Sequence, residues 1–194
     1  MRFSGEEIRD LLIAWLMISL AFAILFSESS FFTEIFLMSF IISLLTAGIG
    51  FLLHELMHKF TAQKYHLWAE FRANYSMLFL AVSFSFFGFI IAAPGAVIIK
   101  GPSSKEKNGK IALAGPAANI ALAIIFLASS FFIDKTAITS LFFNYGFTIN
   151  ALLALFNLIP FPIFDGYKVY NWNKQIYYIF VSLSALLFLS TFFV

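Results

Sequence analysis

Cysteine is absent from the 194-residue chain, and charged residues are scarce. The missing cysteines exclude disulfides, thiolate metal ligands and a cysteine nucleophile. Aspartate, glutamate, lysine and arginine together make up only 11% of the residues, against about 25% in a typical soluble domain. Hydrophobic residues make up 61%, and the mean hydropathy is +0.93. The net charge of +2 is too small to indicate a nucleic-acid partner. We therefore predict one domain, residues 1–194, surrounded mainly by a lipid bilayer.

Five apolar segments are long enough, or nearly so, to cross a bilayer as helices, which takes about 20 residues. They are residues 11–26, 35–58, 111–133, 139–158 and 175–194. The charged start and first apolar segment would also fit a signal peptide, but another apolar segment follows rather than a soluble domain. We therefore interpret residues 11–26 as a first membrane helix. The sequence predicts an all-α polytopic membrane protein.

A sixth apolar segment, residues 76–99, is irregular because it contains Gly88, Pro94 and Gly95. If this segment does not cross the membrane, all of the twelve lysines and arginines except Lys135 fall on one side. Such an excess is typical of a cytoplasmic face. We therefore predict a re-entrant hairpin or a short strand region here, covered by protein or facing a water-filled cavity. An ordinary sixth helix is the alternative, so five or six membrane helices are expected.

The second apolar segment ends in His54-Glu55-Leu56-Met57-His58, which has the pattern H-E-x-x-H. On a helix, residues four apart share a face, so His54 and His58 could hold one zinc ion. Glu55 lies beside that face and could accept a proton from a water whose pKa zinc lowers to about 7. The alternative is a helix end with interfacial histidines. That reading must still explain a cluster of ionisable residues in a membrane helix, where such residues are rare.

A catalytic zinc normally has three protein ligands and a water, so a third ligand is needed. The pattern H-E-x-x-H-x-x-G-x-x-H is excluded because Thr61 and Lys64 stand where it needs glycine and histidine. Glu70 is a possible ligand, but we interpret it as a solvated loop residue that an arginine two positions later can pair with. Asp165 is the better candidate, because the topology that sorts the cations places it on the same side as His58. The alternative for Asp165 is an ordinary aspartate in an interfacial turn.

Two further motifs accompany the histidine pair: Gly-Pro-Ala-Ala-Asn at residues 115–119 and Asn-Leu-Ile-Pro-Phe-Pro-Ile-Phe-Asp-Gly at residues 157–166. The three motifs, within about residues 35–169, resemble HExxH, GPxxN and N-x-x-P-x-P-x-x-D-G of the site-2 protease (M50) family of intramembrane zinc metalloproteases. The resemblance implies one zinc ion held by His54, His58 and Asp165, with Glu55 as general base. It implies regulated intramembrane proteolysis of membrane-anchored proteins. We expect a prokaryotic cell membrane, and the sorted cations predict that the site opens toward the cytoplasm. No PDZ or CBS domain is evident in the sequence.

Substrate-binding residues can also be named. The resemblance places Asn157 and Asn119 near the site, and Asn157 could bond the substrate backbone or an oxyanion. The alternative for both is an interhelical hydrogen bond, which we favour for Asn119. Residues 94–99 are mostly small or β-branched, so they could form a strand whose edge at Gly95, Ala96 and Val97 binds an unwound substrate. Otherwise these residues only return the chain to the interface.

Other functions fit part of the pattern. The histidines and carboxylates could form the transit site of a metal or proton-linked transporter, although the internal repeats common in transporters are absent from the sequence. An inactive scaffold relative is a further alternative, although every catalytic position is occupied. A prenyl-protein endopeptidase shares H-E-x-x-H but does not predict the proline-rich motif before Asp165.

Overall fold

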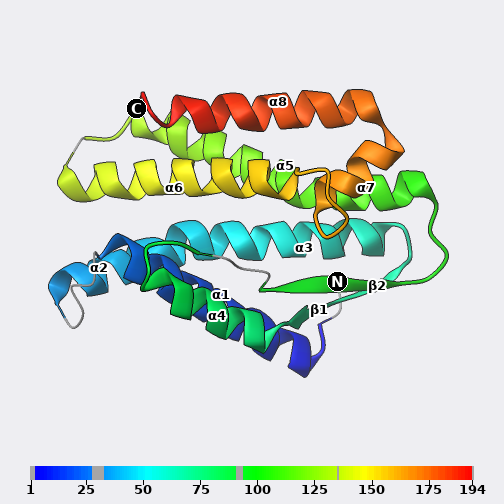
Figure 1. The fold of residues 1–194 in the computed structure, drawn as a ribbon, viewed down its shortest axis with the longest axis horizontal. Coiled ribbons are helices and arrows are strands. Elements are labelled where there is room, and N and C mark those ends of the chain that lie inside the picture. Colours follow the sequence, from blue (N-terminus) through cyan, green and yellow to red (C-terminus); the bar gives the residue numbers. More distant parts are fainter. Residues whose placement is uncertain (1–2, 28–32, 91–93, 135, 194) are drawn as a thin grey trace.

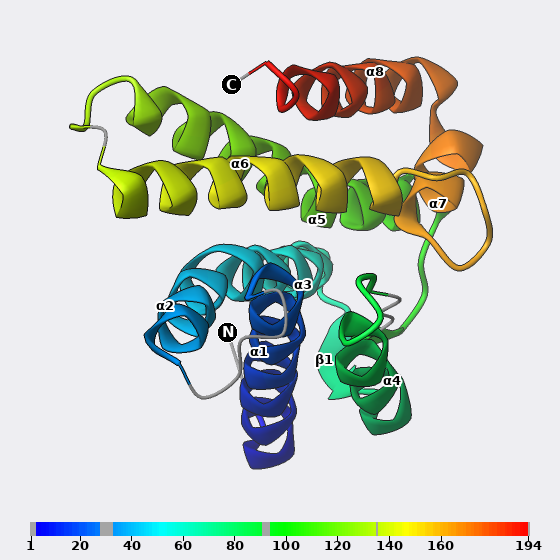
Figure 2. The ribbon, with the colours of Figure 1, turned by 60° about the vertical axis from the view of Figure 1, so that its left-hand side comes forward.

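The computed structural model describes residues 3–27, 33–90, 94–134 and 136–193, and it is mostly helical. In chain order, its elements are α1 (Gly5–Phe26), α2 (Glu34–Ser43), η1 (Leu44–Gly48), α3 (Ile49–Lys64), β1 (Trp68–Ala73), α4 (Tyr75–Ser85), β2 (Gly95–Lys100), α5 (Lys105–Ser130), α6 (Ala137–Asn157), α7 (Asp165–Trp172) and α8 (Lys174–Ser190). Figures 1 and 2 show two groups of elements, one with α1 to α4 and both strands, the other with α5 to α8. Helix α3 packs against α5 where the groups meet.

Four helices are long and apolar enough to cross a membrane: Gly5–Phe26, Glu34–Lys64, Lys105–Ser130 and Ala137–Asn157. The second of these is α2, η1 and α3 in one continuous run. Each run begins after a side chain that accepts a hydrogen bond from a backbone N–H of the first turn; the four capping residues are Ser4, Thr33, Ser104 and Thr136. These helices match the first four predicted spans.

The fifth predicted span, residues 175–194, corresponds to α8, which has 17 residues. Such a helix is shorter than the about 20 residues needed for a straight crossing. The described residues therefore contain four helices of spanning length, fewer than the five or six that the sequence predicts. The difference arises because α8 ends at Ser190 and a turn at Thr191 and Phe192 follows it.

In its described residues, the irregular segment 76–99 contains most of α4 and most of β2. Helix α4 has 11 residues and packs against α1. Strand β2 pairs antiparallel with β1, which places Phe71 opposite Val97 and Ala73 opposite Gly95. The prediction of a short strand region is confirmed, and the alternative of a sixth spanning helix is wrong because α4 is too short.

The interpretation of Glu70 as a solvated loop residue is also wrong. Glu70 lies in β1, it is only 8% exposed, and it pairs with Arg72 at 2.8 Å. It additionally accepts a hydrogen bond from the Ser4 hydroxyl. The alternating pattern of residues 68–72 reflects a strand whose partner is about 30 residues further along the chain.

A π-helical turn, η1, interrupts the α-helical pattern shortly before the two histidines. Such turns are frequent near functional sites. On one side, Trp15 Nε1 of α1 donates to the Leu44 carbonyl oxygen at 3.1 Å. On the other side, a side chain at Gly50 would overlap the side chain of Asn150 on α6. Gly50 thus permits α3 to approach α6 closely, and the nearby small residue Ala47 is fully buried.

Candidate metal centre

The three predicted zinc ligands meet where the two groups of elements contact each other. His54 and His58 lie one turn apart on α3, and their Nε2 atoms are 3.0 Å apart. Oδ2 of Asp165, the first residue of α7, lies 3.3 Å from His54 Nε2 and 2.9 Å from His58 Nε2. Within the described ranges, these three residues form the one group of histidines and carboxylates close enough to hold a metal ion.

Hydrogen bonds of the two imidazoles determine which ring nitrogens are free. His58 Nδ1 lies 2.8 Å from the Ile111 carbonyl oxygen, which can only accept, so Nδ1 carries the hydrogen. His54 Nδ1 lies 2.6 Å from Asn119 Oδ1. The orientation of the Asn119 amide is set because its Nδ2 donates to the Gly50 carbonyl oxygen at 3.1 Å. Both histidines therefore donate from Nδ1 and present the lone pair of Nε2 at the shared point.

This set of donor atoms fits a zinc ion. Ligand atoms about 2.0–2.2 Å from a tetrahedral zinc lie about 3.3–3.5 Å from one another. The observed separations of 2.9, 3.0 and 3.3 Å are close to these values. Because neither Nε2 atom carries a hydrogen, the three atoms would repel one another unless a cation lay between them. Two imidazoles and a carboxylate also leave the fourth position of a tetrahedral zinc for water.

The loop between α6 and α7 places Asp165 at this point. A side chain at Gly166 would overlap the backbone of Leu158, so only glycine lets the start of α7 lie so close to the end of α6. Oδ1 of Asp165 faces Lys168 Nζ at 3.6 Å, and Oδ2 faces the histidines. The loop therefore presents one carboxylate oxygen of Asp165 to the metal site.

Glu55 and all of the predicted substrate-binding residues except Asn119 line a cavity of about 410 Å³ beside the donor atoms. Its walls include His54, Glu55, His58 and Asp165, together with Gly95, Ala96, Val97, Asn157 and Lys168. The Val97 backbone N–H faces the Glu55 carboxylate. The structure thus brings Glu55, the three donor atoms, Asn157 and the predicted strand residues of β2 to one place. Asn157 donates one amide hydrogen to the Leu153 carbonyl oxygen of its own helix at 2.9 Å, and its second amide hydrogen takes no part in that bond.

Asn119 is placed differently. It lies at the far side of His54, is fully buried, and also donates to Asn150 Oδ1 at 3.0 Å. Its amide groups are thus engaged by His54, by the Gly50 carbonyl and by Asn150, as expected of the interhelical role that we favoured for it. Its role as a direct substrate ligand stays a prediction.

Three contributions to the site were not predicted from the sequence. The Ile111 carbonyl oxygen orients His58, and Asn150 holds the amide of Asn119. A side chain at Gly115 would overlap the Nε2 atoms of His54 and His58, so this glycine leaves space for the imidazoles. The glycine in Gly-Pro-Ala-Ala-Asn was the available signal, whereas nothing local marks Ile111 or Asn150.

The chain is 45% identical over 178 residues to a protein of Methanocaldococcus jannaschii named "Putative zinc metalloprotease MJ0611", and the match spans 91% of this chain and 89% of that protein. The chain belongs to this zinc metalloprotease family. No protein-family model matches the metalloprotease, and no solved structure matches it. The similarity agrees with the zinc site predicted from the sequence and with the donor atoms that the structure brings together.

Replacing Asn119 with alanine in this metalloprotease is expected to weaken zinc binding by about 10–100-fold, the usual effect of removing a group that orients a metal-binding histidine. His54 Nδ1 would lose its acceptor, so the imidazole could rotate or change tautomer. Competition with a fluorescent chelator in detergent measures the affinity. Asn171→Ala is the matched control, because Asn171 is exposed and bonds only within α7. An unchanged affinity in Asn119→Ala would contradict the orienting role.

Proposed function

We propose that this metalloprotease is an intramembrane protease of the site-2 type, which hydrolyses peptide bonds in or near transmembrane segments of membrane-anchored proteins. The observation that carries the proposal is the position of the metal centre. His54, Glu55 and His58 belong to a 31-residue helix that is apolar enough to cross a membrane. They face inward onto α5 and α7, while large apolar side chains of the same helix, such as Leu45 and Leu53, are exposed. Soluble proteins rarely expose a large apolar surface of this kind, so these side chains indicate contact with lipid.

The orientation in the membrane is supported by the charges at one end of the molecule. Lysines gather where α3 and β2 end and where α5 and α8 begin, at the right of Figure 1. Several lie over exposed or half-buried aromatic rings, as Lys100 does over Trp68 and Lys110 over Trp172. Basic and aromatic residues together are typical of a cytoplasmic membrane interface. The metal cavity reaches this end, because exposed Lys168 and Asn108 line it, so the site is proposed to open toward the cytoplasm of a prokaryotic cell.

The residues around the cavity can perform peptide hydrolysis. Zinc, when bound, supplies a Lewis acid that makes water more acidic and polarises a carbonyl group. Glu55 is placed to take a proton from the attacking water and to return it to the nitrogen of the leaving amine. The Val97 N–H holds the Glu55 carboxylate in place. Asn157, on the cavity wall, is the candidate donor to the oxygen of the scissile carbonyl.

A substrate must be extended where it is cut, because a helix hides its peptide bonds in its own hydrogen bonds. Strand β2 lines the metal cavity and offers an edge for such a segment. A second, mainly apolar cavity of about 340 Å³ adjoins His54 and Glu55 from the other side, between α1, α3 and α6. Its walls include Phe22, Phe51 and Phe156, which suit a large apolar side chain next to the scissile bond.

Replacing Val97 with proline tests the strand. Proline removes the backbone N–H at this position, so cleavage is expected to fall by at least about tenfold while the zinc content stays the same. Val97→Ala keeps the N–H and is the control. Product formation is followed by mass spectrometry, and zinc by elemental analysis. Undiminished cleavage by Val97→Pro would refute substrate binding along β2.

Removal of the metal tests the proposed function itself. The protein is reconstituted in liposomes with a transmembrane substrate of known sequence, and the products are identified by mass spectrometry. Cleavage is expected to stop when a chelator removes the zinc and to return when zinc, but not magnesium, is restored. Zinc bound at one ion per chain without cleavage of any substrate would contradict the protease and favour a transporter or scaffold.

A further inference from the structure

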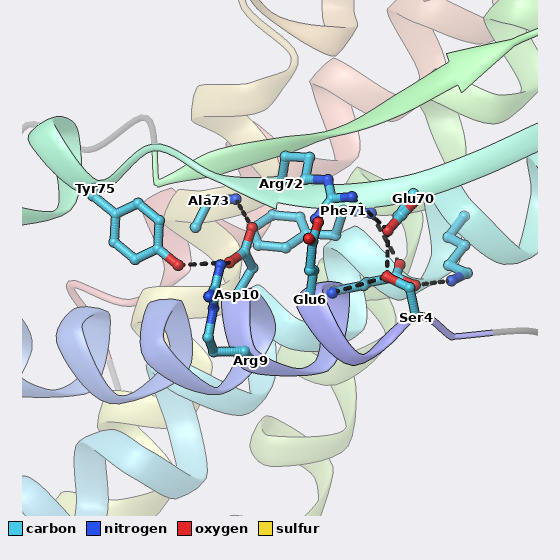
Figure 3. A network of polar contacts seen from close by, with 11 residues as sticks. Ser4, Glu6, Arg9, Asp10, Glu70, Phe71, Arg72, Ala73 and Tyr75 are labelled. Carbon is cyan, nitrogen blue, oxygen red and sulfur yellow. Dashed lines mark hydrogen bonds and ion pairs between the residues drawn. The ribbon is translucent and has the colours of Figure 1, made fainter.

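Two carboxylates on α1, those of Glu7 and Asp10, lie along the outer edge of β1. Figure 3 shows Asp10 beside Ala73. Glu7 Oε1 accepts the Phe71 N–H at 2.9 Å, and Asp10 Oδ2 accepts the Ala73 N–H at 3.2 Å. Glu7 and Asp10 are three residues apart and share a face of α1, while Phe71 and Ala73 are two apart and share an edge of the strand. The carboxylates therefore occupy the places that the carbonyl oxygens of a neighbouring strand would take. An additional strand could therefore pair only with the free edge of β2.

The second oxygen of each carboxylate is also held. Glu7 Oε2 pairs with Lys59 Nζ of α3, and both side chains are only 1% exposed. Asp10 Oδ1 accepts the Tyr75 hydroxyl at 2.6 Å. Lys59 directly follows the metal ligand His58 in the chain. Lys59 and Glu7 thus connect α3, which carries the two histidines, to β1, the strand that pairs with β2.

The direction of these N–H groups determines which atoms of β2 face the metal. Phe71 and Ala73 direct their N–H groups to α1, away from β2. Residues of an antiparallel pair that do not bond each other both point their N–H and C=O groups outward. Val97 and Gly95, the partners of Phe71 and Ala73, must therefore direct theirs to the free edge of β2. The Val97 N–H does so, because it reaches Glu55.

From this geometry we infer that Asp10 and Glu7 are positioning residues that set the register of the sheet against the metal centre, and so determine which peptide bond is cut. The inference rests on the proposed proteolytic function. Neither carboxylate touches the metal cavity, and both act through β1 and β2. Because one face of each strand must stay toward the core, a slip of the sheet would occur in steps of two residues.

Asp10→Ala is the test, since removal of Glu7 would deprive buried Lys59 of its carboxylate partner and endanger folding. We expect a second product displaced by two residues and a decrease in kcat/KM at the original bond of about tenfold or more. Asp10→Asn retains an acceptor for the Ala73 N–H and is expected to restore the single product. Glu6→Gln is the matched control, because Glu6 is exposed and pairs only with the Arg72 side chain. A loss of stability alone would lower the amount of active protein without a displaced product.

Absence of cysteine allows the register to be read without catalysis. The Ser4 hydroxyl of α1 contacts the Glu70 carboxylate of β1, and a slip of two residues would move β1 by about 7 Å along α1. With cysteines at both positions and a short bifunctional thiol reagent, we expect efficient cross-linking that is lost in Asp10→Ala and restored in Asp10→Asn. Intact cross-linking in Asp10→Ala, or an unchanged product, overturns the inference. A wild type that binds zinc and cuts nothing refutes the proposed function instead. In that case, loss of the cross-link in Asp10→Ala still supports the control of register by Asp10. Persistence of the cross-link still overturns that inference.

Discussion

Glutamine at position 55 is expected to stop peptide-bond cleavage while the protein keeps its zinc. The amide has nearly the shape of the carboxylate and can still accept the Val97 N–H, so the cavity and the donor atoms should be preserved. It cannot take a proton from water, and loss of a general base typically lowers the rate by about 10²–10⁴-fold. Zinc content is measured by elemental analysis and products by mass spectrometry, on the same liposome preparations.

Glu106→Gln is the matched control for this experiment. Glu106 is an exposed glutamate at the start of α5 that pairs with Lys110 and is not part of the lining of the metal cavity. It should bind zinc and cleave as the wild type does. Full activity in Glu55→Gln would show that another group accepts the proton. Loss of zinc in Glu55→Gln would show instead that the residue supports the metal site rather than the proton transfer.

Asparagine at position 165 is expected to produce the second large effect, the loss of tightly bound zinc. Asp165 supplies the one negative charge among the three donor atoms, and its Oδ2 lies within 3.3 Å of both Nε2 atoms. Removal of a direct ligand should cost more than the about 10–100-fold that follows from removal of an orienting partner. Affinity is measured by competition with a chelator, and cleavage should fall in parallel at limiting zinc.

Asp134→Asn serves as the control, because Asp134 is an exposed aspartate in the turn between α5 and α6. Unchanged zinc affinity in Asp165→Asn would mean that the third ligand is elsewhere. Glu70, the other carboxylate considered from the sequence, would not be a good substitute, because it lies in β1 and is engaged by Arg72 and Ser4.

The metal centre could be predicted from the sequence because its chemistry is local. A helix brings His54 and His58 together at a spacing of four residues, and the proline-rich loop before Asp165 limits where that aspartate can lie. The four long apolar helices could be predicted for a similar reason, since a run of about 20 apolar residues is typical of a membrane-spanning helix.

Features that depend on distant contacts could not be predicted in this way. Residues 68–73 form a strand because β2 pairs with them and because Glu7 and Asp10 accept the N–H groups on the other edge. Glu7 and Lys59 look like ordinary interfacial charges in the sequence, and only the fold pairs them in the interior. Asn150 and the Ile111 carbonyl orient the metal site through contacts between helices, and no local sequence pattern predicts these contacts.

The π-helical turn at Leu44–Gly48 fixes the direction in which the zinc-binding face of α3 points. Such a turn accommodates one residue more than a regular α-helix would, and each residue rotates the helix by about 100°. The part before the turn is oriented by Trp15 of α1, and the part after it by Asn119 and Asn150. Deletion of a single residue here would convert the turn to regular α-helix and leave the histidines facing Asp165. Insertion of a further residue would instead rotate the histidines by about 100° away from Asp165. During evolution the segment can therefore lose one residue, but a gain of one residue would separate the two halves of the metal site.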